Sequence, residues 1–182
     1  MRPTLAAAAL VGLVFTSLAV DPAGLAPFGP ARWALVPTLA LVAGAAASAR
    51  RFAVVRLPTL AWAAFLLAVA IAAAAGLDPL YAWLGTPERR FGAATWLLCA
   101  VAFLAAHTVP RRDHRVLAGA VAVTAGLIGA WTVAELAGWE PVRLVGVGDR
   151  PVGPFGSSAY LGAAAVLLGP VAAGLAAERR SR

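Results

Sequence analysis

The chain has 182 residues, of which 62% are hydrophobic and only 13% are charged, and its mean hydropathy is +0.84. Soluble domains are closer to half apolar and a quarter charged, so this composition excludes a soluble enzyme and a disordered chain. The net charge of +7 does not indicate a nucleic-acid partner, because all 15 basic residues are Arg and they occur in small groups between long apolar runs. The one cysteine, Cys99, lies inside such a run, which excludes a disulfide framework and a thiolate metal site.

Six stretches of the sequence contain no acidic or basic residue and are each about as long as a membrane-crossing helix. They cover residues 3–20, 33–49, 57–77, 91–110, 116–134 and 151–177. A helix needs about 20 apolar residues to cross ~30 Å of hydrocarbon, and a charge at its centre costs roughly 2.5–3.5 kcal/mol. A soluble bundle of buried helices is disfavoured, because too little polar sequence remains to cover such a core.

We therefore predict an all-α fold, a polytopic transmembrane helix bundle that forms one domain. Its six membrane spans are expected at about residues 3–20, 33–49, 57–77, 91–110, 116–137 and 157–177. The first stretch also has features of a cleaved signal peptide, but its apolar run is long for that role and favours a retained helix.

The arginines between the spans fall into a strong group and a weak group of helix ends. The strong group is Arg2, Arg50, Arg51, Arg56, Arg111, Arg112, Arg115, Arg179, Arg180 and Arg182. The weak group is Arg32, Arg89, Arg90, Arg143 and Arg150. The positive-inside rule places the strong group in the cytoplasm, so both termini are predicted to be cytoplasmic.

The predicted external loop between residues 78 and 92 holds Arg89 and Arg90, adjacent arginines on the side where the positive-inside rule disfavours them. The guanidinium group is a planar fork that matches phosphate oxygens and stays charged at any working pH. The pair is therefore a candidate for recognition of a phosphorylated substrate. The alternative is pairing with Glu88 or with lipid phosphate, since arginines at helix ends often reach the headgroups.

In the predicted external loop between residues 138 and 158, Arg150 is followed by Gly153, Gly156 and Ser157, directly before the sixth span. A glycine-rich turn that opens a helix presents backbone N–H groups that favour anions, so with Arg150 it could hold a phosphate. Ser157 or Ser158 is a candidate N-cap. The same residues also describe a tight turn without a ligand. Glu135, near the outer end of the fifth span, is interpreted as a side chain that reaches the headgroups.

No motif for a metal or a nucleotide is present. His107 and His114 are not at ligand spacing with each other or with an acidic pair, and the charged run at residues 111–115 is interpreted as a solvated cytoplasmic anchor. There is no Walker loop and no G-x-S-x-G pattern. We expect no metal, no cofactor and no self-contained catalytic site.

Two segments carry a family resemblance. In GTPERRFGAATWLL, residues Gly85 to Leu98, an Arg precedes a Gly by three residues at a helix start, here Arg89 and Gly92. In RPVGPFGSSAYLGAAAVLLGP, Arg150 to Pro170, an Arg precedes a Gly-x-Phe-Gly turn, and an aromatic and small residues follow. Both segments resemble signatures of the O-antigen ligase and O-antigen polymerase family, although residues 157–159 read Ser-Ser-Ala where the family has Asn-Pro-Asn.

The resemblance implies a polytopic glycosyltransferase of the bacterial inner membrane. Such an enzyme moves a glycan from a polyprenyl-diphosphate carrier to an acceptor on the external face, without a nucleotide sugar or a metal. Membrane lipid and the lipid-linked glycan would be its partners. The candidates for binding the diphosphate are Arg89, Arg90, Arg150, Gly153, Gly156 and Ser157.

The family has more than six spans, and its catalytic external loop lies further along the chain. This sequence is therefore expected to be the N-terminal part, with the C-terminal half missing and the catalytic residues unassigned. Two other functions remain open, a six-span transporter or permease component and a non-catalytic membrane partner. Transporters usually have ionisable residues or broken helices near the midplane. The span centres here lack charges, although Pro37, Pro58 and Pro170 lie within or near spans.

Overall fold

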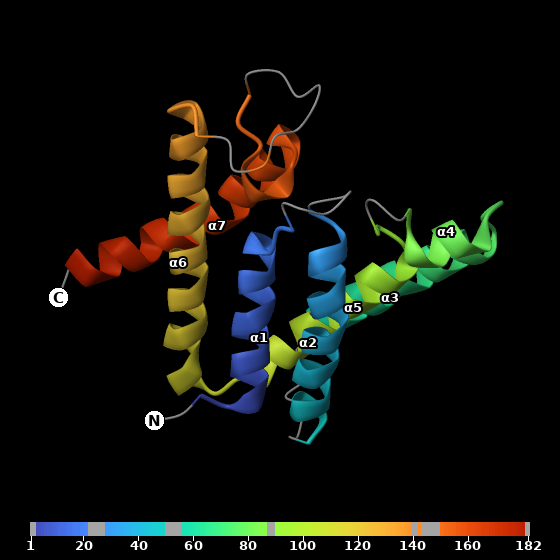
Figure 1. Cartoon of the computed structure of the whole chain (residues 1–182). Helices are drawn as coiled ribbons and strands as arrows, with labels where there is room; N and C mark the ends of the chain where they lie inside the picture. The colour runs from blue at the N-terminus through green and yellow to red at the C-terminus, as the bar shows by residue number, and fades with distance from the viewer. Residues whose placement is uncertain are drawn as a thin grey trace.

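The computed structural model describes residues 3–21, 28–49, 56–86, 90–139, 142 and 150–180. Its elements in chain order are α1 (Leu5–Phe15), η1 (Thr16–Leu18), α2 (Pro30–Ser48), α3 (Arg56–Ala74), α4 (Pro79–Leu84), α5 (Ala93–His107), α6 (Arg111–Leu136), η2 (Gly153–Phe155) and α7 (Ser158–Arg180). Within these ranges every regular element is a helix and no strand occurs (Figure 1). The predicted all-α class is therefore confirmed for the described residues.

Each of the six predicted spans falls on a helix. Within the described residues, three helices are long and apolar enough to cross a membrane. These are Leu57–Ala74, Arg111–Leu136 and Ser158–Ala177. The other three predicted spans form shorter apolar helices, Leu5–Leu18, Arg32–Ser48 and Ala93–His107. The last of these is only about 22 Å long at 1.5 Å per residue, against ~30 Å of hydrocarbon.

The fourth and fifth predicted spans meet at a sharp junction that moves both helix ends. α5 stops at His107, and the hydroxyl of Thr108 donates to the carbonyl of Ala105 at 2.8 Å. Pro110 then stands at the N-cap of α6, because its fixed φ suits a helix start and not the continuation of a helix. α6 consequently begins at Arg111 instead of at the predicted residue 116, and the charged run forms its first turn.

The predicted external loop between residues 78 and 92 contains a short helix, α4 (Pro79–Leu84), that was not expected from the sequence. The carboxylate of Asp78 accepts the N–H of Tyr81 at 3.1 Å, and Pro79 occupies the first helical position. Asp at the N-cap and Pro at the next position are common signals of a helix start. The Asp-Pro pair therefore marks this helix in the sequence, although α4 is too short to show a periodic apolar pattern.

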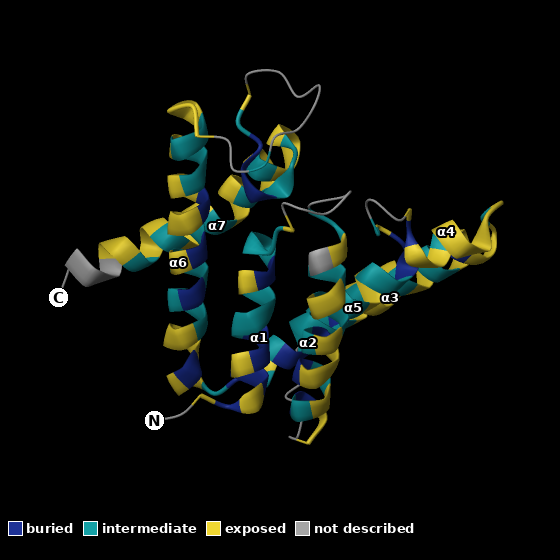
Figure 2. Ribbon diagram, in the orientation of Figure 1, coloured by how far each residue is buried: buried dark blue, intermediate teal, exposed yellow. Residues whose placement is uncertain are grey.

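The core lies where α1 packs against α2, α5 and α6 (Figure 1). Its buried residues are Ala6, Ala7, Ala9, Leu10, Ala43, Ala47, Ala105 and Val109. Small residues allow this close approach, since a Cβ atom at Gly44 of α2 would lie 2.6 Å from a methyl carbon of Val101 on α5. The apolar window of α7, by contrast, contains no buried residue, and Figure 2 shows exposed positions along it.

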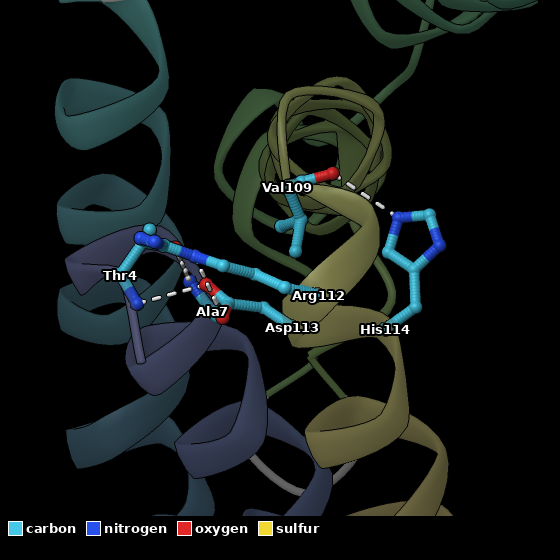
Figure 3. A network of polar contacts seen from close by, with 6 residues as sticks. All are labelled: Thr4, Ala7, Val109, Arg112, Asp113 and His114. Carbon is cyan, nitrogen blue, oxygen red and sulfur yellow. Dashed lines mark hydrogen bonds and ion pairs between the residues drawn. The ribbon is translucent and has the colours of Figure 1, made fainter. Parts of the chain in front are cut away.

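At one end of the bundle, the start of α6 is tied to the start of α1 (Figure 3). Asp113 is only 4% exposed, and its Oδ2 accepts the backbone N–H of Thr4 at 2.9 Å. The hydroxyl of Thr4 in turn accepts the N–H of Ala7 at 3.3 Å and so caps α1. The exposed Arg112 places its Nε 3.6 Å from Oδ1 of Asp113. The interpretation of this charged run as a solvated anchor is therefore wrong for Asp113.

Candidate functional site

The two segments singled out by the sequence analysis meet where α5 and α7 begin. Phe91 lies just before α5, and Tyr160 lies in the first turn of α7. Their ring centroids are 6.1 Å apart and their planes are inclined by 65°. Aromatic pairs with this edge-to-face geometry attract each other. The contact therefore joins residues 85–98 to residues 150–170.

The loop that leads into α5 is closed by two glycines with touching backbones. A Cβ atom at Gly92 would collide with the backbone of Gly85, which itself has a φ of +75°. Between them Arg90 has a φ of 54°, which is uncommon for a residue with a side chain. Its N–H donates to the carbonyl of Thr86 at 2.8 Å, and its carbonyl accepts the hydroxyl of Thr95. This loop therefore holds the backbone of Arg90 in one defined conformation.

Glu135, in the last turn of α6, binds the turn that carries the other candidates. Its Oε2 accepts the backbone N–H groups of Val152 and Gly153, each at 2.9 Å. Its Oε1 accepts the indole N–H of Trp131, also at 2.9 Å. Hydrogen bonds to an ionised acceptor are stronger than neutral ones. An internal carboxylate thus occupies the backbone donors of this glycine-rich turn.

Arg32, in the first turn of α2, also holds this turn. Its guanidinium donates to the carbonyls of Ser17 at 2.9 Å and of Ala19 at 3.3 Å, and to the carbonyl of Pro154. Its guanidinium carbon lies 5.1 Å from the ring centre of Phe155, within the range of a cation–π contact. One side chain therefore links the region after α1, the start of α2 and η2.

The three candidate arginines differ in how the structure places them. Arg89 lies outside the described residues. Arg90 is half-buried and Arg150 is exposed. Among the described residues, neither of these two guanidinium groups has a hydrogen-bond, ion-pair or cation–π partner.

The remaining candidates form one turn into α7. Gly153 and Gly156 have φ values of +56° and +66°, which favour glycine, and a Cβ atom at Gly156 would collide with the ring of Phe28. Ser157 directly precedes the first residue of α7. The N–H of Gly153, which the sequence analysis considered for phosphate, donates to Glu135.

Sequence reasoning missed the contacts of Glu135 and Arg32. The i, i+4 spacing of Trp131 and Glu135 on a helix is a readable signal for their hydrogen bond. Arg32 stands at a helix N-terminus, where the helix dipole disfavours a positive charge, and this position hints at a specific partner. No sequence signal identifies the backbone N–H groups of residues 152 and 153 as the partners of Glu135.

Comparisons of the chain with protein-family models, with curated proteins and with solved structures found no match. Over the part of the chain that the structure describes, no group of three or more His, Cys, Asp or Glu side chains is placed to hold a metal ion.

Proposed function

We propose that this chain forms a membrane part of an O-antigen ligase-like glycosyltransferase. In this proposal it binds a polyprenyl-diphosphate-linked glycan at the external face of the bacterial inner membrane, from where the glycan passes to an acceptor. The observation that carries the proposal is the contact between Phe91 and Tyr160, because it unites two segments that separately resemble the same family.

The chemistry of Arg90 and Arg150 supports this proposal. A lipid diphosphate presents phosphate oxygens at the membrane surface while its polyprenyl chain lies in hydrocarbon. A guanidinium group binds such oxygens with paired, charge-assisted hydrogen bonds. The two arginines precede α5 and α7, so a phosphate bound by them lies where apolar helices begin.

We also propose that six helices cross the membrane, with both termini in the cytoplasm. Two contacts support this arrangement. Thr4 and Asp113, in contact, lie at helix ends that the positive-inside rule assigns to the cytoplasm, and Glu135 and Val152, also in contact, lie at ends assigned to the external side. The shorter helices α1, α2 and α5 pack against one another. Non-helical backbone at membrane depth is tolerated where protein surrounds it, so short helices fit the interior of a bundle.

A transporter component is the alternative function. Its basis is Pro37 inside α2 and Pro170 inside α7, because proline can interrupt the helices of transporters, although α2 and α7 both continue through these residues. A transporter of another substrate would have no need of Arg90 and Arg150 for affinity toward a polyprenyl diphosphate. The binding experiment below therefore separates the two functions.

The test is binding of a polyprenyl diphosphate to the full chain in lipid nanodiscs, compared with the corresponding polyprenyl alcohol. We expect the diphosphate to bind more tightly than the alcohol. We also expect Arg90→Ala or Arg150→Ala to weaken its binding by about ten- to a hundredfold, since a charged hydrogen bond contributes about 1.5–3 kcal/mol. Lysine at either position should weaken binding less than alanine. Arg115→Ala is the matched control, because Arg115 is an exposed arginine near the start of α6, whereas the proposed site lies near the end of this helix.

Equal affinity for the diphosphate and the alcohol would contradict the proposed function. Loss of binding in the Arg115→Ala control would also contradict it, because that result indicates attraction by net charge alone. The proposed sidedness has a separate test. With Cys99 replaced by Ala, a Ser157→Cys variant should react with an impermeant thiol reagent in intact cells, and labelling only in broken cells would reverse the orientation.

A further inference from the structure

The turn that contains η2 depends on contacts from outside itself. Gly153 and Gly156 both have positive φ, a region that glycine enters freely, so the turn alone has many accessible conformations. Val152 and Gly153 nevertheless are buried, and both donate their N–H groups to Oε2 of Glu135 at 2.9 Å. The carboxylate thus selects one conformation of this turn.

The conformation of this turn decides where two functional candidates lie. Arg150 precedes Val152 by two residues, and Ser157 follows the turn at the start of α7. A change of backbone direction at Val152 or Gly153 would move the guanidinium of Arg150 relative to α7. A binding site that is formed in only a fraction of the molecules has its apparent affinity reduced by that fraction.

We propose that Glu135 is a positioning residue of the diphosphate site, an inference that rests on the proposed function. Its carboxylate never touches the lipid diphosphate. It fixes the backbone of Val152 and Gly153, and through them the position of Arg150 and the start of α7. Arg32, bonded to the carbonyl of Pro154, supports the same turn.

The sign of the effect separates positioning from simple electrostatics. Glu135 is negatively charged, so the removal of its charge would strengthen the binding of an anion nearby if charge alone mattered. A positioning role predicts that affinity follows the hydrogen bonds and not the charge. The two conservative variants of Glu135 separate these effects, because glutamine keeps the length of the side chain and aspartate keeps the charge.

The experiment measures polyprenyl diphosphate binding and amide hydrogen exchange on the full chain in nanodiscs. For Glu135→Asp, whose shorter side chain withdraws the carboxylate, we expect faster exchange at Val152 and Gly153 and about tenfold weaker binding. In Glu135→Gln the amide oxygen can still accept both backbone N–H groups, although its amide nitrogen cannot accept the indole N–H of Trp131. We therefore expect a smaller loss of affinity, about threefold. Gly126→Ala on α6, where a Cβ atom meets no neighbour within 4 Å, is the first control and should bind as the parent does.

Asp113→Asn is the second control, because it alters a buried carboxylate on the same helix at the opposite end. It should reduce stability but keep the affinity for the diphosphate. If Glu135→Asp binds as tightly as the parent while Glu135→Gln binds more tightly, the effect is one of charge and the positioning role is overturned. Unchanged exchange at Val152 and Gly153 in Glu135→Asp would overturn it as well. A parent chain that does not bind the diphosphate refutes the proposed function itself, whereas a parent that binds with an unaffected Glu135→Asp variant refutes only the positioning role.

Discussion

The two ends of α6 use the same chemistry in different surroundings. At the first turn, Asp113 accepts the N–H of Thr4, next to the alanine-rich core that α1, α2 and α5 form. At the last turn, the part-buried Glu135 accepts two N–H groups of a turn outside this core. At one end, the carboxylate of Asp113 joins the starts of two helices. At the other end, the carboxylate of Glu135 holds the turn that follows Arg150.

The largest expected change in stability is that of Asp113→Ala. The buried N–H of Thr4 would lose a charged acceptor, and we expect the free energy of unfolding to fall by about 3 kcal/mol. Unfolding in mixed detergent and SDS micelles, followed by tryptophan fluorescence, measures this change. Asp113→Asn keeps an acceptor oxygen and should lose less. Parent-like stability of Asp113→Ala would show that the core end does not depend on this contact.

A second test asks whether close helix packing stabilises the core end. In Gly44→Ala the new methyl group would lie 2.6 Å from a methyl carbon of Val101, so either the Val101 side chain must rotate or α2 and α5 must move apart, and we expect a loss of about 2 kcal/mol. Gly126→Ala on α6 is the matched control, because a Cβ atom there meets no neighbour within 4 Å. The control should be as stable as the parent or slightly more so. Equal effects at the two glycines would contradict the role assigned to the α2–α5 contact.

Thr124 lies between the two ends of α6, and its replacement is expected to raise the stability instead of lowering it. Its side chain is buried, and its hydroxyl has no hydrogen-bond partner among the described residues. Thr124→Val keeps the shape and removes an unsatisfied polar atom, so we expect a gain of about 1 kcal/mol in the same unfolding assay. Thr124→Ser, which keeps the hydroxyl, is the control. A valine variant less stable than the parent would indicate that the hydroxyl is satisfied.

The smallest expected effect is that of Arg112→Ala. Its side chain is 58% exposed and its contact with Asp113 is 3.6 Å long, so the ion pair contributes only about 0.2–1 kcal/mol. Added salt should reduce the difference between the parent and the variant further. A loss as large as that of Asp113→Ala would show that the ion pair, and not the hydrogen bond to Thr4, secures this end of α6.

The positions of the long helices could be predicted from the sequence because charge is expensive in hydrocarbon. Each charge-free window falls on a helix. The ends of the helices were less predictable, because local hydrogen bonds and proline decide them. Thr108 and Pro110, at the end of one apolar window, separate α5 from α6, which begins within the charged run at Arg111. The Asp-Pro pair at 78 and 79 starts a helix in a region expected to be a loop.

The position of the candidate site along the chain could be predicted from the sequence, whereas the contacts that hold it in place could not. The glycine-rich turn before the sixth span occurs directly before α7, as the Gly and Ser residues suggested. The partners of that turn are a different matter. Glu135 meets Val152 and Gly153 only because α6 and η2 pack together, and the ring of Phe91 meets that of Tyr160 across 69 residues of sequence. Such contacts depend on tertiary packing, which periodicity and charge counts along the chain do not contain.

In the proposed membrane-spanning arrangement, the length of α6 relates these two ends to the thickness of the surrounding lipid. At 1.5 Å per residue, Asp113 and Glu135 lie about 33 Å apart along the helix axis, close to the ~30 Å thickness of a typical hydrocarbon layer. In a thicker bilayer, one acidic group is drawn below the surface or the lipid thins around the helix. Membrane thickness should consequently change the strain on the segment before α7, which makes acyl-chain length a physical control over how firmly Arg150 is held.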